Sequence, residues 1–244
     1  MRALFCLGLA ACSLPALAEE AAPAPAFSGA ADVAYLKSTG SSEKETFKGR
    51  LEAKYVTGVW THEGALEGIN ESTEITDPVT LETTNNRTKE RYLAQAKTSR
   101  RFTARDYLFL KLQAETDKQS SYDYQAFAAV GYGRDVIKTD TMKLALEIGA
   151  GNRHNEGNGA GDTEDEAMGN AALNYEWKFR PGARFFEEAA LETGEKSTVV
   201  RSRTGLEFDL TNVLKLAIAY EYKRDDGPAD LEDTLTVVGL SYKF

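Results

Sequence analysis

Apolar and polar residues alternate along most of the chain, most clearly in residues 47–55. In this segment the odd positions are apolar or aromatic side chains or glycine, and the even positions are charged: Phe47, Gly49, Leu51, Ala53 and Tyr55 against Lys48, Arg50, Glu52 and Lys54. Successive side chains of a β-strand point to opposite faces. The segment therefore predicts a strand with one apolar face and one charged face.

The same period of two recurs along the chain and predicts twelve strands. Their ranges are 27–37, 47–55, 60–71, 89–99, 107–116, 124–133, 142–151, 167–179, 184–193, 198–210, 214–222 and 234–244. An even number of strands of about ten residues, separated by polar turns, is typical of bacterial outer-membrane barrels. We therefore predict an all-β fold, a transmembrane antiparallel up-and-down β-barrel of about 12 strands over residues 27–244.

The connections between these strands alternate in length. The short ones are 57–58, 100–105, 134–141, 180–182 and 211–212, and the longer polar ones are 38–46, 70–88, 116–121, 152–166, 194–197 and 223–232. Outer-membrane barrels have short periplasmic turns and longer outer loops, so both chain ends are expected on the periplasmic side. Aromatic residues beside the short turns predict an interfacial girdle of Trp60, Phe102, Tyr107, Tyr132, Trp177 and Phe179.

The first eighteen residues predict a secretory signal peptide. Arg2 precedes an apolar run, and Ala16-Leu17-Ala18 forms a small-residue cleavage motif. Cleavage there would leave a short periplasmic leader, residues 19–26. An alternative reads residues 9–12 as a lipoprotein box in which Cys12 is acylated.

Cysteine would be absent from the mature chain, because Cys6 and Cys12 both lie in the predicted signal peptide. Disulfides, thiolate metal sites and thiol nucleophiles are then excluded. Mean hydropathy is -0.43, and after the signal peptide no apolar run reaches the roughly 18 residues of a spanning helix. An isoelectric point near 5.0 argues against nucleic acid as a partner.

The final strand carries one apolar stripe and stops on an aromatic ring. The stripe consists of Val238, Leu240, Tyr242 and Phe244. This ending resembles the assembly signal of bacterial outer-membrane β-barrels, which implies the outer-membrane assembly machinery as a partner. The expected location is the outer membrane of a Gram-negative bacterium, in contact with its lipid and lipopolysaccharide.

The polar faces of the predicted strands define a charged lumen. Its expected residues are Lys48, Arg50, Glu52, Lys54, Arg91, Gln95, Lys97, Lys111, Gln113, Glu115, Lys143, Glu147, Arg201, Arg203, Glu207, Glu221 and Lys223. Charges of both signs can pair across a narrow barrel and close it, or line a water-filled passage. Twelve strands lie between filled eight-stranded barrels and open sixteen-stranded porins, so both alternatives remain.

An enzymatic alternative centres on His154, one of two histidines, at the outer end of its strand. It would be the base of a surface lipid- or glycan-modifying enzyme, with Ser120, Ser121 or Ser197 as nucleophile. No local nucleophile motif surrounds these serines. His62 follows a predicted periplasmic turn, at the wrong end. We therefore expect no enzymatic activity, no catalytic residues and no cofactor.

Two outer loops are rich in oxygen ligands. One holds Asn155, Asn158, Asp162, Glu164, Asp165 and Glu166, and the other holds Asp225, Asp226, Asp230, Glu232 and Asp233. Calcium takes six to eight oxygen ligands, but the spacing matches no calcium motif. We expect these loops to keep the rim soluble and to meet lipopolysaccharide through divalent cations, without a dedicated metal site. The acidic pairs at 187–188 and 225–226 fit glycosidic chemistry only by their number.

The mature chain as a whole resembles the family of salt-induced outer-membrane proteins, which is defined by a domain of unknown function. The resemblance lies in Trp60 with Gly64 and Gly68, in residues 174–179 and 214–222, and in the final strand. It implies an outer-membrane location, a barrel fold and a link to salt or osmotic conditions. Our leading functional hypothesis is an envelope-integrity or small-solute channel role under such conditions. The resemblance supplies no site residues.

Overall fold

The computed structural model describes residues 26–38, 43–76, 83–120, 122–157, 162–227 and 230–244, and the regular elements among them are β-strands. The strands are β1 (Ala26–Ser38), β2 (Glu43–Thr57), β3 (Trp60–Thr76), β4 (Thr83–Arg101), β5 (Asp106–Asp117), β6 (Tyr122–Lys138), β7 (Met142–Gly157), β8 (Thr163–Arg180), β9 (Ala183–Gly194), β10 (Thr198–Asp209), β11 (Leu214–Asp225) and β12 (Leu231–Lys243). Among these residues no helix is long and apolar enough to cross a bilayer. The predicted signal peptide lies outside the described residues.

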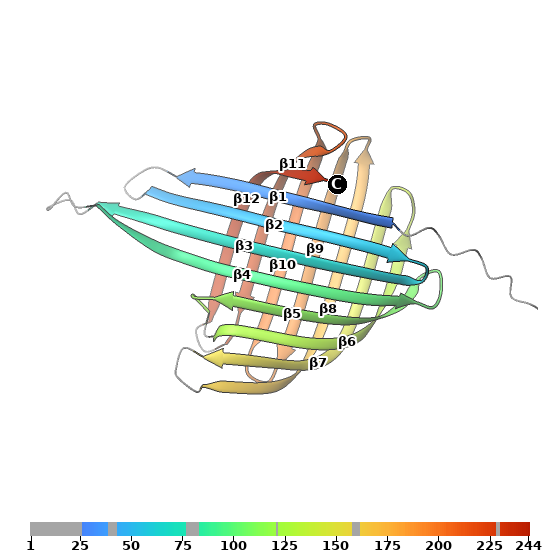
Figure 1. The fold of residues 1–244 in the computed structure, drawn as a ribbon, viewed down its shortest axis with the longest axis horizontal. Helices are drawn as coiled ribbons and strands as arrows, with labels where there is room; N and C mark the ends of the chain where they lie inside the picture. The colour runs from blue at the N-terminus through green and yellow to red at the C-terminus, as the bar shows by residue number, and fades with distance from the viewer. Residues whose placement is uncertain (1–25, 39–42, 77–82, 121, 158–161, 228–229) are drawn as a thin grey trace, which may run out of the picture.

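The strands form one closed wall in which sequence neighbours are antiparallel and β1 pairs with β12. The predicted twelve-stranded up-and-down barrel is therefore confirmed. In Figure 1 the front strands, β1 to β6, run across the view, whereas β8 to β12 behind them run steeply. This crossing follows from the tilt that strands adopt when a sheet closes. Side chains of the front wall therefore face those of the rear wall across the lumen.

The two faces of the wall follow the period of two. Leu51 lies opposite Leu66 on the neighbouring strand, and both side chains are exposed on the outer surface. Arg50, the preceding residue, lies opposite Asp32 and Glu67 on the inner face. Apolar residues thus face the lipid side and charged residues face the lumen.

The prediction of long outer loops was wrong, because much of their length is strand. Residues 70–88 contain the end of β3 and the start of β4, and residues 152–166 contain the ends of β7 and β8. Only short turns separate β5 from β6 and β9 from β10. Beyond the bilayer a hairpin needs no apolar face, yet its backbone groups still need partners. The ladder therefore continues through polar sequence that carries no alternating apolar signal.

Tyr107, predicted for the aromatic girdle, instead points into the lumen and is 7% exposed. It lies directly opposite Gly133, where an added Cβ would come within 2.3 Å of the Tyr107 ring. The glycine therefore provides the space that the ring fills. The prediction used only nearness to a turn and ignored that odd-numbered residues of β5 face inward. The other predicted girdle residues are exposed, namely Trp60, Phe102, Tyr132, Trp177 and Phe179.

The seam between β1 and β12 is the shortest ladder in the wall. It runs only from Ala30–Lys243 to Ala34–Gly239. Two backbone hydrogen bonds, of 2.9 and 3.1 Å, extend it to Gly29 and Phe244. Beyond Ala34 and Gly239 the two strands separate, although each stays paired with its other neighbour.

Candidate functional site

The lumen contains a cavity of about 650 Å³. Fourteen of the seventeen predicted lumen residues line it. Of the other three, Lys48 faces a smaller cavity at the seam, Glu207 pairs with Arg184 and Lys215, and Lys143 lies at the rim, 3.9 Å from Glu176. The cavity lining includes nine Lys or Arg residues and nine Asp or Glu residues, so its formal side-chain charge balances.

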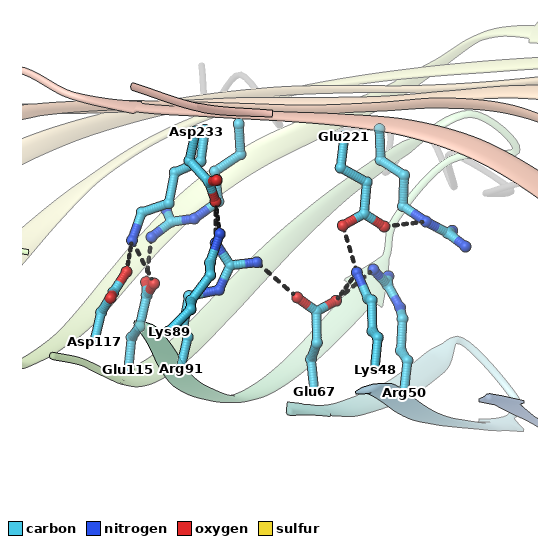
Figure 2. Close-up of polar contacts among 12 residues, drawn as sticks. Lys48, Arg50, Glu67, Lys89, Arg91, Glu115, Asp117, Glu221 and Asp233 are labelled. Atoms are coloured by element: carbon cyan, nitrogen blue, oxygen red, sulfur yellow. Dashed lines mark hydrogen bonds and ion pairs between the residues drawn. The ribbon is translucent and has the colours of Figure 1, made fainter. Parts of the chain in front are cut away.

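One group of ion pairs surrounds Glu67 on β3 (Figure 2). Its carboxylate lies 3.2 Å from Lys48 Nζ, 3.5 Å from Arg50 Nη1 and 3.0 Å from Arg91 Nη2. Lys48 also donates to Glu221 on β11, on the opposite wall. Buried charges are tolerated when they are paired in this way. This group therefore ties the front wall to the rear wall.

A second group surrounds Glu115 on β5. Lys223 Nζ, from β11, lies 2.7 Å from Glu115 and 2.8 Å from Asp117. Arg201 on β10 also pairs with Glu115. Lys89 on β4 donates to Asp233 on β12, and Figure 2 shows these side chains meeting between the two walls. The second group thus joins the front and rear walls as well.

A third group lies nearer the chain termini. Lys97 Nζ is 3.1 Å from Glu63 and 2.8 Å from Glu147. The Tyr107 hydroxyl donates to the same Glu147 carboxylate at 2.7 Å. The inward tyrosine therefore completes a charged cluster.

The cavity is open at one end and closed at the other. Toward the chain termini its side chains are accessible, with Lys54 50% and Glu52 40% exposed. Toward the far end they are covered, with Lys223 4% and Asp117 3% exposed. Ser120 Oγ, which donates to buried Asp225, adds to this closure. The lumen therefore resembles a vestibule that ends in buried ion pairs.

A buried polar cluster lies beside the closed end. The guanidinium of Arg153 donates to Glu166 at 2.6 Å, and to the carbonyl and hydroxyl oxygens of Ser197 at 2.6 and 2.8 Å. Asn155, which is fully buried, also donates to Glu166. These contacts join the β7–β8 hairpin to the β9–β10 turn.

Sequence reasoning missed several members of these groups. Glu63 and Glu67 alternate with Gly64, Leu66 and Gly68, and this period of two could have placed both carboxylates on the inner face. The remaining missed residues lay in predicted loops, in strands whose polar face was not assigned, or outside the predicted lumen set: Asp32, Lys89, Asp117, Arg153, Glu166, Glu188, Glu192, Lys215 and Asp233.

His154 is not brought together with the proposed serine nucleophiles. Its ring nitrogens lie 2.7 Å from Asp165 and 3.5 Å from Glu156, in a row of outward-facing side chains. Ser120 and Ser197 are buried on the inner side and are bonded to other groups. Ser121 lies outside the described residues.

The acidic stretches are used for internal contacts. In the first, Glu166 binds Arg153, and in the second, Asp225 binds Ser120. In the part of the chain that the structure describes, no group of three or more His, Cys, Asp or Glu side chains could hold a metal ion. Asn158 of the first stretch lies outside that part.

The family model described as "Protein of unknown function, DUF481" matches residues 31–244. The chain belongs to this family. A relative of this chain, the uncharacterized protein YdiY of Escherichia coli (strain K12), is 24% identical over 226 residues, covering 84% of this chain and 86% of the relative. The description of the DUF481 family assigns no chemical activity to its members.

Two solved barrels are similar to this DUF481 chain in fold. The NanC porin matches with a TM-score of 0.53 at 12% identity, over 88% of this chain and 100% of that chain. The COG4313 outer membrane channel from Pseudomonas putida F1 matches with a TM-score of 0.51 at 13% identity, over 95% and 99%. At this identity the likeness concerns the fold alone.

Proposed function

We propose that the protein is a narrow outer-membrane channel for small hydrophilic solutes. The observation that carries this proposal is the cavity of about 650 Å³ inside a closed barrel. A barrel that is only structural would fill its lumen with side chains. Here the cluster of buried apolar side chains comprises Phe127, Ala129 and Met168, and the cavity is lined by charged side chains together with small and neutral residues.

The solute would be small, because cross-lumen ion pairs divide the space. Arg50 on β2 reaches Glu188 on β9 at 3.3 Å, and Lys223 seals the far end against Glu115. Since the lining charges balance, the passage would favour neither strongly anionic nor strongly cationic solutes. The two barrels of similar fold, a porin and an outer membrane channel, agree with this role by analogy.

A structural role in envelope integrity is the second candidate. It is favoured by the same cross-lumen pairs, which brace the wall from inside. The expected response to salt or osmotic conditions is part of this proposal and rests on family resemblance. Deletion of the gene followed by growth at raised osmolarity would test it, with complementation as the control.

Location in a Gram-negative outer membrane, with lipid, lipopolysaccharide and the assembly machinery as partners, completes the proposal. Divalent cations would bridge the outer acidic residues to lipopolysaccharide.

The deciding experiment is single-channel recording of the refolded full chain in planar bilayers. We expect small, weakly selective conductance steps. A change of gel mobility on boiling would verify that the protein is a folded, closed barrel. If such folded protein gave no conductance, the structural role would be favoured.

A further inference from the structure

One row of inward side chains in the lumen carries no charge. Ala65 on β3 lies opposite Gln95 on β4, which in turn lies opposite Gln113 on β5. All three residues line the main cavity. Apart from Leu93, their inward neighbours along the same strands are charged: Glu63 and Glu67 on β3, Lys97 on β4, and Lys111 and Glu115 on β5. The neutral row therefore separates two charged parts of the lumen.

The charged groups on both sides of this row are engaged with partners of opposite sign. On one side Lys97 Nζ lies 2.8 Å from Glu147, and on the other Lys223 Nζ lies 2.7 Å from Glu115. A charged ligand would have to break such a pair, which leaves a buried charge uncompensated. An uncharged polar ligand can enter beside the row and leave these pairs intact.

The two glutamine amides of the row are not engaged in this way. Gln113 is 8% exposed and Gln95 is half-buried. Among the residues that the structure describes, neither side chain makes a hydrogen bond. Each amide has two N–H donors and a carbonyl acceptor, and a buried amide without a partner costs free energy. The row therefore offers donors and acceptors to a polar group inside the cavity.

Lys111, the inward residue next to Gln113 on β5, adds further donors. Its side chain is 7% exposed, and its Nζ lies 5.1 Å from the centre of the Phe127 ring. Nζ also lies 3.7 Å from Glu192 Oε1, close enough to balance its charge but too far for a hydrogen bond. Lys111 can therefore donate to an oxygen of a ligand without acting as the counter-ion of an anion.

We propose that Gln95, Gln113 and Lys111 form a binding site for an uncharged, polyhydroxylated solute of monosaccharide size. A hydroxyl group both donates and accepts, so it matches the amide carbonyls, the amide N–H groups and the ammonium group. The cavity of about 650 Å³ has the size of a small-molecule site. This site names the solute class of the proposed channel and in that sense rests on the proposed function, but binding itself needs only the cavity.

Equilibrium dialysis of the refolded full chain against radiolabelled D-glucose tests the site. The protein is kept in a detergent without a sugar headgroup, so that the detergent does not compete. We expect saturable binding of glucose, and competition by D-glucuronate that is at least about fivefold weaker than by unlabelled glucose, because its carboxylate would lack a free counter-ion. The absence of saturable binding, or stronger competition by glucuronate, would overturn the proposal.

A variant in the neutral row makes the test specific. Gln113→Met removes the amide but keeps an unbranched side chain, and should lower glucose affinity about fivefold or more. Gln119→Met is the matched control, because Gln119 is exposed beyond the end of β5 and does not line the cavity. Heat-dependent gel mobility verifies folding, and Gln95→Met replaces Gln113→Met if the latter does not fold. Unchanged glucose affinity in the folded variant contradicts the site.

Binding and conduction are measured separately, so the two proposals can fail separately. A barrel that conducts but binds no glucose would refute the site and leave the channel standing. A barrel that binds glucose through Gln113 but does not conduct would refute the channel and support the site, because dialysis does not depend on passage across a membrane.

Discussion

Single carboxylates hold several cations in this lumen. Glu67 is the clearest, because its 9% exposed side chain contacts Lys48, Arg50 and Arg91. Replacing one partner in a buried charge group leaves the others uncompensated, which costs more than the pair itself contributes.

Glu67→Gln should therefore lower the free energy of unfolding by about 3–5 kcal/mol. Glu52→Gln is the control, since Glu52 is 40% exposed and such a pair contributes less than about 1 kcal/mol. Equilibrium urea unfolding in lipid vesicles measures both. Equal losses of unfolding free energy in the two variants would mean that water screens the buried charge of Glu67 as fully as the exposed charge of Glu52.

His154→Ala should leave barrel assembly and the lipid A profile unchanged. His154 is exposed, and its partners Asp165 and Glu156 are exposed as well. Gel mobility and mass spectrometry of extracted lipid A provide the readouts. Disappearance of a specific lipid product on this one change would revive the enzymatic alternative.

At the scale of the strand, the sequence predicted which strands form and which side chains of each face the lumen, but not how long each strand is. The alternation in residues 47–55 places Leu51 outside and Arg50 inside, because lipid and lumen impose opposite demands on successive residues. Residues 70–76 and 83–88 carry no such signal, although they lie in β3 and β4. Partners across the lumen, such as Lys48 and Glu221, were also unpredictable, because the tilt of the strands decides which residues face each other.

The final strand makes its own prediction. Phe244 packs near Phe27, with ring centroids 6.1 Å apart, and covers Gly29, where an added Cβ would come within 2.3 Å of the Phe244 ring. Phe244→Asp should therefore reduce the heat-modifiable, assembled form sharply, because a charge replaces the ring at the closing seam. Lys243→Gln is the comparison and should assemble nearly normally. Full assembly of Phe244→Asp would show that this ring does not direct closure.

The whole molecule consists of two crossing walls that buried ion pairs hold together. Lys89–Asp233 and Lys223–Asp117 connect β4 and β5 with β12 and β11 at the closed end. If the lumen conducts, we expect these contacts to limit the passage, since they join the two walls across it.

Lys89→Gln combined with Asp233→Asn should thus raise single-channel conductance at least about twofold, because removing both charges releases the two side chains without leaving either one unpaired. Glu90→Gln with Lys118→Gln removes an outward pair from the same strand ends, with Lys118 69% exposed, and should leave conductance unchanged. Planar-bilayer recording compares them. Identical conductance in both double variants would place the constriction elsewhere.

The pairing of Gly29 with Phe244 also sets the order in which the strands can pair during assembly. Each other ladder joins neighbours along the chain and can form as soon as its second strand has been exported. The β1–β12 ladder joins the two ends, so β1 must wait with one edge open until the last residue arrives. Closing so long a loop is slow even where its entropic cost is modest. A waiting open edge also invites pairing with a foreign strand, so chaperoning of β1 during this interval would matter as much as any contact in the finished barrel.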